Sequence, residues 1–588
     1  MGTRSKTLAL VTAASLTALA ACGDGAGGTR NLGFEECEDA PMTCNSGDPV
    51  EGGSVAWGMD ATWGGWNLYS ADDGVAALYW ALRPMAAGIG LGNWNQNEEF
   101  VYDDAILAGE PRLASEDPLT VEYPLNPEAN WGDGQPITLD DWIYHWYATS
   151  ADAERCDGCP IGDTWGTNVA AVEEPEDDLI QVTYEDGYTT PEWPYENAFF
   201  GTAPTHVLDD AGLGDWKTDP ETMAETFDYF STTVPEWSTG PFTIASAEVS
   251  DYVTYERNPD WAGGEGPYLD ELTIRAYDEF DTLLTELKQG TLQGATPMNV
   301  SPEGIRNLES DAPGMGVKYH VSSGSAWGHI DFNMQGQYTS DQAFRQAVFY
   351  ALDREELNGR VSGLVLDDVP PKGNHAFRND SDYYVDHIGA AGQGEGDVDR
   401  AKRTLEDAGY TLEGDVLHTP DGEPVTLTFR FSNTSESSTY AEIAQSQLKD
   451  LGIEVETAVI PNNEFGDVLA ERQFDMIHYG FGTTPLFTET PYDLWHSTGG
   501  SNYGGLDDPD VDAAVEKIRR TTDLDQAAEY ANDAVRLVVD QAYQLPVGER
   551  AGVVIADEGL VNVRENWADT YRVLYNVHEW GWSELPEN

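Results

Sequence analysis

Four of the five cysteines occur as two close pairs, so the first question is what chemistry those pairs support. Cys156 and Cys159 have C-x-x-C spacing, which suits a redox pair, half of a zinc site or a short disulfide loop. A tetrahedral zinc site needs four ligands, and no second pair with this spacing follows. Cys37 and Cys44 are also close enough to form a small loop. The pattern favours structural disulfides in an oxidising compartment over redox or metal chemistry.

Aspartate, glutamate and tryptophan are abundant, as they are in enzymes that cleave glycans. Such enzymes need two carboxylates at a defined separation. With 105 acidic residues, pairs such as Asp103-Asp104 and Asp507-Asp508 arise from composition alone. The sequence has no G-x-S-x-G or H-E-x-x-H motif, and His375 and His387 stand isolated. We expect no catalytic residue, cofactor or metal site, and keep a secreted glycan hydrolase only as a remote alternative.

The fifth cysteine follows an N-terminal export pattern. Arg4 and Lys6 precede an uncharged run, Leu8 to Leu19, that is too short to span a bilayer and has the layout of a signal peptide. The run ends in Leu19-Ala20-Ala21-Cys22-Gly23, which resembles the lipobox of bacterial lipoproteins. That resemblance implies cleavage after residue 21 and acylation of Cys22. We expect a protein held by lipid on the outer face of the cytoplasmic membrane.

The charge of the chain excludes some partners. A formal charge of -75 with a pI near 4.1 repels nucleic acid phosphates and anionic lipid head groups. Such charge strains the compact state by self-repulsion that salt screens, so we expect a saline habitat.

The length of 588 residues predicts two or three domains. Residues 22–52 are rich in Gly, Asp, Glu and Ser, which predicts a flexible tether.

Periodicity predicts the elements that must position any site. Val425 to Phe431 alternates in strand fashion, a helix follows to Leu451, and Ile453 to Val459 alternates again, which indicates a βαβ unit. A helix is expected from Asp341 to Glu356, with Thr339 and Gln342 as its capping box. Further helices are expected over 398–408, 511–518 and 527–539. The mixture indicates α/β lobes.

Five motifs occur in the order found in one known family. They are Asn130-Trp131-Gly132-Asp133-Gly134-Gln135-Pro136-Ile137-Thr138, Ser238-Thr239-Gly240-Pro241-Phe242, Tyr255-Glu256-Arg257-Asn258-Pro259-Asp260-Trp261, Pro267-Tyr268-Leu269-Asp270-Glu271-Leu272, and Phe344-Arg345-Gln346-Ala347 with Leu352-Asp353-Arg354. The ordered set resembles the solute-binding proteins of family 5, the extracytoplasmic receptors of oligopeptide, dipeptide and nickel ABC importers. Pro371-Lys372-Gly373-Asn374-His375 further resembles an actinobacterial branch.

The resemblance implies a two-lobed α/β fold of the periplasmic-binding-protein type, which closes on its ligand like a hinge. We expect a monomer that delivers an oligopeptide or peptide-like ligand to a permease and ATPase complex. The implied boundaries are 1–21 for the signal peptide, 22–52 for the tether, 53–299 for the first lobe with an extra subdomain near 75–190, 300–545 for the second lobe, and 546–588 for a return to the first lobe.

The resemblance also indicates where ligand contacts lie, near the start of the second lobe and after a later strand. Trp327, Tyr479 and Phe481 are the expected aromatic walls, because aromatic rings give large contact areas at low entropy cost. The other expected contacts are His329, Asn333 and Thr483, with Trp495, Asn374 and Trp63 as further candidates.

One departure from the family pattern concerns the acid that pairs with a peptide's free ammonium. The matching stretch here, residues 480–485, reads Gly-Phe-Gly-Thr-Thr-Pro and carries no acid. Glu489 and Asp493 follow a little later. A buried ammonium without a counter-charge is costly, so the pattern favours a blocked, cyclic, modified or non-peptide ligand. A metal chelate, an oligosaccharide and a sensor role remain alternatives.

Overall fold

The computed structural model describes residues 34–37, 40–70, 73–86, 91–159, 164–196, 198–199, 201–298, 300–366, 369–461 and 464–586. The expected signal peptide and the acylated Cys22 lie outside the described residues.

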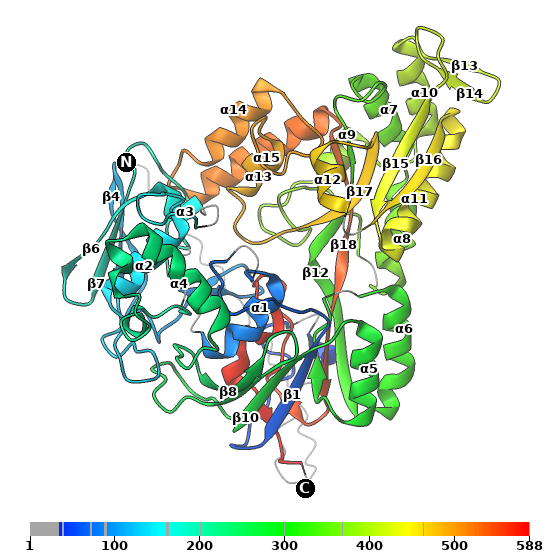
Figure 1. Ribbon diagram of the computed structural model, residues 1–588. Coiled ribbons are helices and arrows are strands. Elements are labelled where there is room, and N and C mark those ends of the chain that lie inside the picture. Colours follow the sequence, from blue (N-terminus) through cyan, green and yellow to red (C-terminus); the bar gives the residue numbers. More distant parts are fainter. Residues whose placement is uncertain are drawn as a thin grey trace, which may run out of the picture.

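One ten-stranded sheet runs through both lobes (Figure 1), in the order β16-β15-β17-β12-β18-β11-β1-β10-β9-β8. Its strands are β1 (Ser54–Met59), β8 (Phe242–Glu248), β9 (Tyr252–Arg257), β10 (Glu271–Ala276), β11 (Gly294–Ala295), β12 (Val317–Phe332), β15 (Thr426–Ser432), β16 (Glu454–Ile460), β17 (Met476–Gly482) and β18 (Gln544–Asp557). The expected two-lobed α/β fold is confirmed.

The long strands β12 and β18 pass from one lobe to the other, and we call this antiparallel pair the hinge ribbon. Their pairing register shifts between Ser323 and Trp327 and again between Gly328 and His329. Such irregularities bend a strand and increase its twist. The ribbon is therefore bent where the lobes meet.

Lobe I contains the strands from β11 to β8, together with an extra subdomain. The subdomain is a four-stranded sheet of β4 (Arg112–Glu116), β5 (Leu119–Pro124), β7 (Leu179–Tyr184) and β6 (Val169–Glu176), beside α2 (Leu139–Thr149) and α3 (Thr164–Asn168). Thr138 caps α2, and Asp141 completes a capping box with it. The remaining elements are β2 (Gly92–Trp94), β3 (Phe100–Tyr102), α1 (Ala76–Leu82), α4 (Pro220–Thr232), α5 (Phe280–Gln289) and α6 (Pro302–Asp311).

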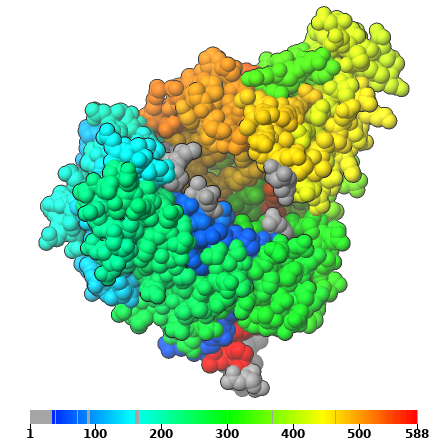
Figure 2. All heavy atoms as spheres, in the orientation of Figure 1, coloured from blue at the N-terminus to red at the C-terminus, as the bar shows by residue number. Residues whose placement is uncertain are grey.

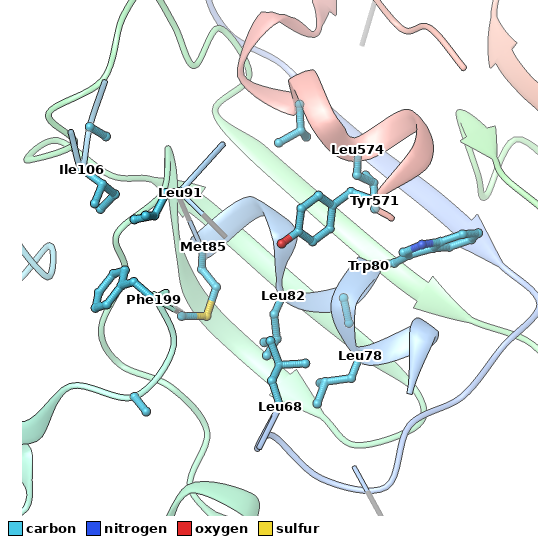
Figure 3. Close-up of a cluster of buried hydrophobic side chains, with 14 of the residues drawn as sticks. Leu68, Leu78, Trp80, Leu82, Met85, Leu91, Ile106, Phe199, Tyr571 and Leu574 are labelled. Atoms are coloured by element: carbon cyan, nitrogen blue, oxygen red, sulfur yellow. The ribbon is translucent and has the colours of Figure 1, made fainter. Parts of the chain in front are cut away.

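The division between the lobes falls inside the hinge ribbon. Leu283 of α5 and Ile305 of α6 share one core with Val553 at the lobe I end of β18. The chain thus enters lobe II within β12, later than the predicted residue 300. The chain end returns to lobe I, where Figure 3 shows Tyr571 and Leu574 beside Leu82 of α1.

Lobe II is built around the predicted βαβ unit, which is confirmed: β15, α11 (Ser435–Leu448) and β16 follow in sequence, and the two strands pair in parallel. The other elements are α7 (Gln342–Ala351), α8 (Arg354–Gly359), α9 (His387–Ala391), α10 (Val398–Asp407), β13 (Thr411–Glu413), β14 (Val416–His418), α12 (Phe465–Ala470), α13 (Thr490–Trp495), α14 (Pro509–Ile518) and α15 (Leu524–Asp540). The helices predicted over 398–408, 511–518 and 527–539 are confirmed.

The single helix predicted from Asp341 to Glu356 is wrong, because α7 ends before a second helix, α8, begins. Asp353 caps α8 by accepting a hydrogen bond from the Glu356 N–H. The predicted capping box at Thr339 is also wrong. Asp341 caps α7 instead, and the Thr339 hydroxyl donates to the Asn333 carbonyl.

The N-terminal segment from Phe34 onward packs on lobe I, which differs from the flexible tether predicted over 22–52. Phe34 is buried, and the Asn45 side chain donates to the Val563 carbonyl at 2.8 Å. The expected disulfides are present as Cys37–Cys44 and Cys156–Cys159. Phe34 lies beside His320 of β12, with ring centroids 6.4 Å apart. The chain end, with β19 (Leu560–Val561) and β20 (Gly581–Trp582), contacts the same segment, where the Arg564 guanidinium donates to the Cys44 carbonyl at 2.8 Å.

Candidate ligand-binding cleft

The space between the lobes is hollowed in the space-filling view (Figure 2). Three cavities there meet on the segment Gly482–Pro491, between β17 and α13, which we call the cleft loop. A fourth cavity of about 250 Å³ lies at the hinge ribbon. Because the cleft loop touches three cavities and belongs to lobe II, it forms the central wall of the cleft.

The first cavity has a volume of about 230 Å³. Aromatic side chains of lobe I line one side of it, and the cleft loop lines the other. Trp94, Phe100 and Tyr195 contact one another with ring centroids 4.9–5.4 Å apart. Thr484 and Leu486 face them from lobe II. We call this the aromatic cavity, and both lobes contribute to it.

Asp569 lies at the base of the aromatic cavity and fixes its wall. Its carboxylate accepts hydrogen bonds from the Trp94 N–H at 3.0 Å and the Tyr571 N–H at 2.8 Å. Burial raises the pKa of Asp569 to about 6. The sequence carried no signal for this wall, because its residues come from separate segments with no shared periodicity.

Three of the predicted contact residues line a second, small cavity behind the cleft loop. Trp327, Thr483 and Trp495 surround it, together with His375, which sequence reasoning did not select for the cleft. Phe481 lines the third cavity, the outer cavity, of about 550 Å³. The fold therefore brings four of the predicted residues to the cleft.

His329 and Tyr479 lie behind this wall and are buried. His329 Nδ1 is 2.6 Å from Asp331 Oδ1, and the Tyr479 hydroxyl donates to Asp331 Oδ2 at 3.1 Å. The His329 ring stacks on Phe481 at 4.5 Å. These two side chains support the wall from behind.

Asn333, Asn374 and Trp63 line none of the four cavities. The Asn333 amide donates to the carbonyls of Arg472 and Phe474, which ties β12 to the segment before β17. The Asn374 amide donates to the Val385 carbonyl and to Asn532. Trp63 is buried beside Trp66 in lobe I. The hydrogen-bonding capacity of the two amides is used within their own lobe.

Two acids lie in or just after the cleft loop, and both have partners within lobe II. Glu489 pairs with Arg519 at 2.9 Å, and Asp493 accepts a hydrogen bond from the Ser501 N–H at 3.2 Å. Burial raises the pKa of Glu489. Neither acid lines the small cavity.

The hinge cavity carries two guanidinium groups. Arg550 pairs with Glu436 at 2.8 Å, and Arg572 pairs with Glu565 at 2.6 Å. One terminal nitrogen of Arg572, Nη2, has no hydrogen-bond partner among the described residues. Around these charges the lining is mostly small or apolar.

Lobe I touches the cleft loop directly through Glu192. Its Oε1 accepts hydrogen bonds from the N–H groups of Phe487 at 2.8 Å and Thr488 at 2.9 Å. Burial raises the pKa of Glu192 to about 7. A second contact joins the Ser381 hydroxyl to Glu98 at 3.0 Å. In this structure two acids of lobe I therefore accept hydrogen bonds from lobe II.

The described residues contain no group of three or more His, Cys, Asp or Glu side chains placed to hold a metal ion. They also contain no helix with the length and apolar character needed to cross a membrane.

The matching family model and the similar known proteins point to one family. The model of bacterial extracellular solute-binding proteins, family 5, matches residues 107–503. The oligopeptide-binding protein OppA of Mycobacterium tuberculosis is 28% identical over 452 residues, covering 76% of this chain and 71% of that protein. AppA of Bacillus subtilis, also an oligopeptide-binding protein, is 22% identical over 475 residues, covering 79% and 80%.

Solved structures agree in fold. The periplasmic EDTA-binding protein EppA has a TM-score of 0.83 at 26% identity, covering 93% of this chain and 99% of that one. The structure of AppA from Bacillus subtilis with a nonapeptide has a TM-score of 0.66 at 19% identity, covering 91% and 100%. Together with the ordered motifs and the two-lobed cleft, the matched family model shows that this chain belongs to the bacterial extracellular solute-binding proteins of family 5.

Proposed function

We propose that this protein is the receptor of an ABC importer, which captures an oligopeptide or a peptide-like ligand between its lobes and delivers it to a permease and ATPase complex. Acylation of Cys22 would hold it on the outer face of the cytoplasmic membrane. No step of this task requires catalysis.

The observation that carries the proposal is a cavity with walls from both lobes. Trp94 and Tyr195 of lobe I face Thr484 and Leu486 of lobe II across about 230 Å³. Concave sites with aromatic walls and few polar groups bind small ligands and tolerate varied side chains. The relatives named as oligopeptide-binding proteins support the same class of ligand.

A second candidate ligand is an anionic metal chelate. The hinge cavity presents Arg550 and Arg572, and guanidinium groups suit bidentate recognition of carboxylates. The similar structure of the EDTA-binding protein EppA supports this candidate. Both guanidinium groups already pair with acids of the chain, so we rank the peptide-like ligand first.

Native mass spectrometry of the soluble chain from Gly23 onward tests the proposal. The mass as purified is compared with the mass after unfolding, and released compounds are identified. A set of peptides or peptide-like compounds is the expected result. A single polycarboxylate chelate would overturn the peptide assignment in favour of the second candidate. Protein that is empty as purified should instead gain thermal stability with a peptide library, and no gain would contradict the proposal.

A further inference from the structure

The small cavity behind the cleft loop has the composition of a recognition subsite, and the inference drawn from it rests on the proposed function. Its volume is about 10 Å³, which is room for about one water molecule or one ligand oxygen atom. Its lining includes the hydrogen-bonding side chains of Trp327, His375, Thr483 and Trp495. We call it the polar cavity.

Each of these four side chains carries a polar atom with no partner in the described part of the chain. The atoms are Trp327 Nε1, Trp495 Nε1, Thr483 Oγ1 and His375 Nδ1. The residues are 1%, 1%, 8% and 3% exposed. Buried polar groups in proteins are nearly always hydrogen-bonded, and an unmet one is costly. Four of them around one cavity point to a ligand that satisfies them.

The donors and acceptors among these atoms can be assigned. Each indole N–H is a donor only. His375 Nε2 lies 2.9 Å from the Gln544 carbonyl, so that nitrogen carries the proton and Nδ1 is an acceptor. Burial lowers the pKa of His375 to about 3, which keeps the ring neutral. These four unpartnered atoms therefore comprise two donors, one acceptor and one hydroxyl group.

The imidazole of His375 lies close to both indoles. The His375 ring lies 6.2 Å from the Trp327 ring and 5.7 Å from the Trp495 ring, at interplanar angles of 86° and 88°. Both indoles thus stand nearly perpendicular to the imidazole. A ligand group that carries an acceptor and a donor close together, such as an amide, matches donors and an acceptor on neighbouring rings.

No acid lines the polar cavity. The nearest acids on the cleft loop side are already used: Glu192 accepts from the N–H groups of Phe487 and Thr488, and Glu489 pairs with Arg519. An ammonium group buried here would face two N–H donors and no counter-charge, which is strongly unfavourable. The cavity therefore discriminates against a free amino terminus.

We propose that the polar cavity recognises an uncharged amide at the end of the ligand. Only the carbonyl oxygen of this amide enters the cavity, where it accepts hydrogen bonds from the indole N–H groups of Trp327 and Trp495. The amide N–H stays at the opening and donates to His375 Nδ1. The protein accordingly selects peptides with blocked or cyclised ends over peptides with free amino termini.

Two matched libraries test this selection. Mixed-sequence pentapeptides are prepared with free amino termini and, from the same pool, with N-acetyl groups. Each is incubated with the soluble chain from Gly23 onward, and retained peptides are quantified by affinity-selection mass spectrometry. We expect at least about tenfold greater retention of the acetylated library, since unmet buried hydrogen bonds carry penalties of that size.

Three variants locate the effect. Trp495→Phe removes one donor and His375→Phe removes the acceptor, and each should reduce the preference to about threefold or less. Trp165→Phe is the matched control, because Trp165 is also buried with an unpartnered indole N–H but lies in the extra subdomain. It should leave the preference unchanged. Thermal melting checks folding, and Trp327→Phe replaces either variant that fails to fold.

The outcomes distinguish a failure of the amide subsite from a failure of the proposed peptide ligand. Equal or greater retention of the free-amine library by the wild-type chain overturns the subsite while the peptide receptor stands. An unchanged preference in folded Trp495→Phe and His375→Phe also overturns it. Retention of neither library overturns the proposed peptide ligand and, with it, this subsite.

Discussion

At the scale of single residues, the sequence could not show which of the candidate side chains line the cleft. Trp327 and Tyr479 were predicted on equal grounds, yet Trp327 lines the polar cavity while Tyr479 donates to Asp331 behind the wall. Glu192, which no motif marks, makes the direct contact between lobe I and the cleft loop. Its neighbours in that contact lie 295 and 296 residues later in the chain.

The Glu192 contact predicts a pH dependence of lobe closure. Its pKa is raised from 4.5 to about 7 in this structure, so the protonated carboxyl is favoured when the lobes touch. The favourable contribution of Glu192 to the free energy of lobe closure is fully present below about pH 4.5. It is lost as the pH rises through about 7, an effect on the order of 3 kcal/mol. Small-angle X-ray scattering should show a more compact protein at pH 5.5 than at pH 8.

Glu192→Gln should remove most of this pH dependence, because the amide oxygen still accepts the two N–H groups and no longer titrates. Glu185→Gln, at an exposed position earlier in the same segment, is the matched control and should behave like the wild-type chain. A Glu192→Gln variant with the full wild-type pH response would contradict the assignment.

At the scale of elements, the hinge ribbon carries a buried charge cluster. Glu549 on β18 lies 3.6 Å from Lys372 and 3.7 Å from Arg378, and it accepts a hydrogen bond from the Ser323 hydroxyl on β12. Burial lowers the pKa of Lys372 to about 8, so its charge depends on this partner. The cluster ties both strands of the ribbon to the segment around residues 372–378.

Glu549→Ala should lower the free energy of unfolding by about 3–5 kcal/mol, since it leaves two buried cations without their shared carboxylate. Urea denaturation followed by tryptophan fluorescence measures the loss. Glu456→Ala on the exposed face of β16 is the control and should change stability by less than about 0.5 kcal/mol. A loss at Glu549 no larger than the control would show that the cluster does not stabilise the ribbon.

The short N-terminal element depends on its disulfide. Cys37 and Cys44 enclose a small loop, for which the chain-entropy model gives about 2–3 kcal/mol. A Cys37→Ala, Cys44→Ala double variant should release the segment from Phe34 to Asn45 and speed its cleavage in limited proteolysis. Cys156→Ala, Cys159→Ala should leave cleavage at this segment unchanged, and equal acceleration in both would contradict a local role.

At the scale of the whole molecule, charge is the dominant feature. With 105 acidic residues against 30 Lys and Arg, the carboxylates far outnumber the cationic side chains that could pair with them. Electrostatic self-repulsion then opposes compaction, and its range falls from about 10 Å in 0.1 M salt to about 3 Å in 1 M salt. Stability should follow the ionic strength.

The melting temperature should rise by about 5 °C or more when NaCl is increased from about 0.02 to 1 M, as screening relieves the repulsion. Differential scanning calorimetry of the soluble chain from Gly23 onward measures this change. Sucrose at equal osmolality separates screening from general exclusion effects, and it should give the smaller shift. A melting temperature independent of NaCl would contradict a role for self-repulsion.

The sequence by itself determined the parts of the protein that depend on neighbours along the chain. The β15-α11-β16 unit and the two disulfides follow from periodicity or short spacing, and the ordered motifs indicated the family. Only the tertiary structure decided which side chains face the cleft. The aromatic cavity, the polar cavity and the Glu192 contact combine distant segments, and the bent hinge ribbon and lobe packing bring those segments together. Local sequence patterns indicate whether a side chain is buried, but not which distant residue it contacts. The candidate ligand site is therefore defined only by the folded chain.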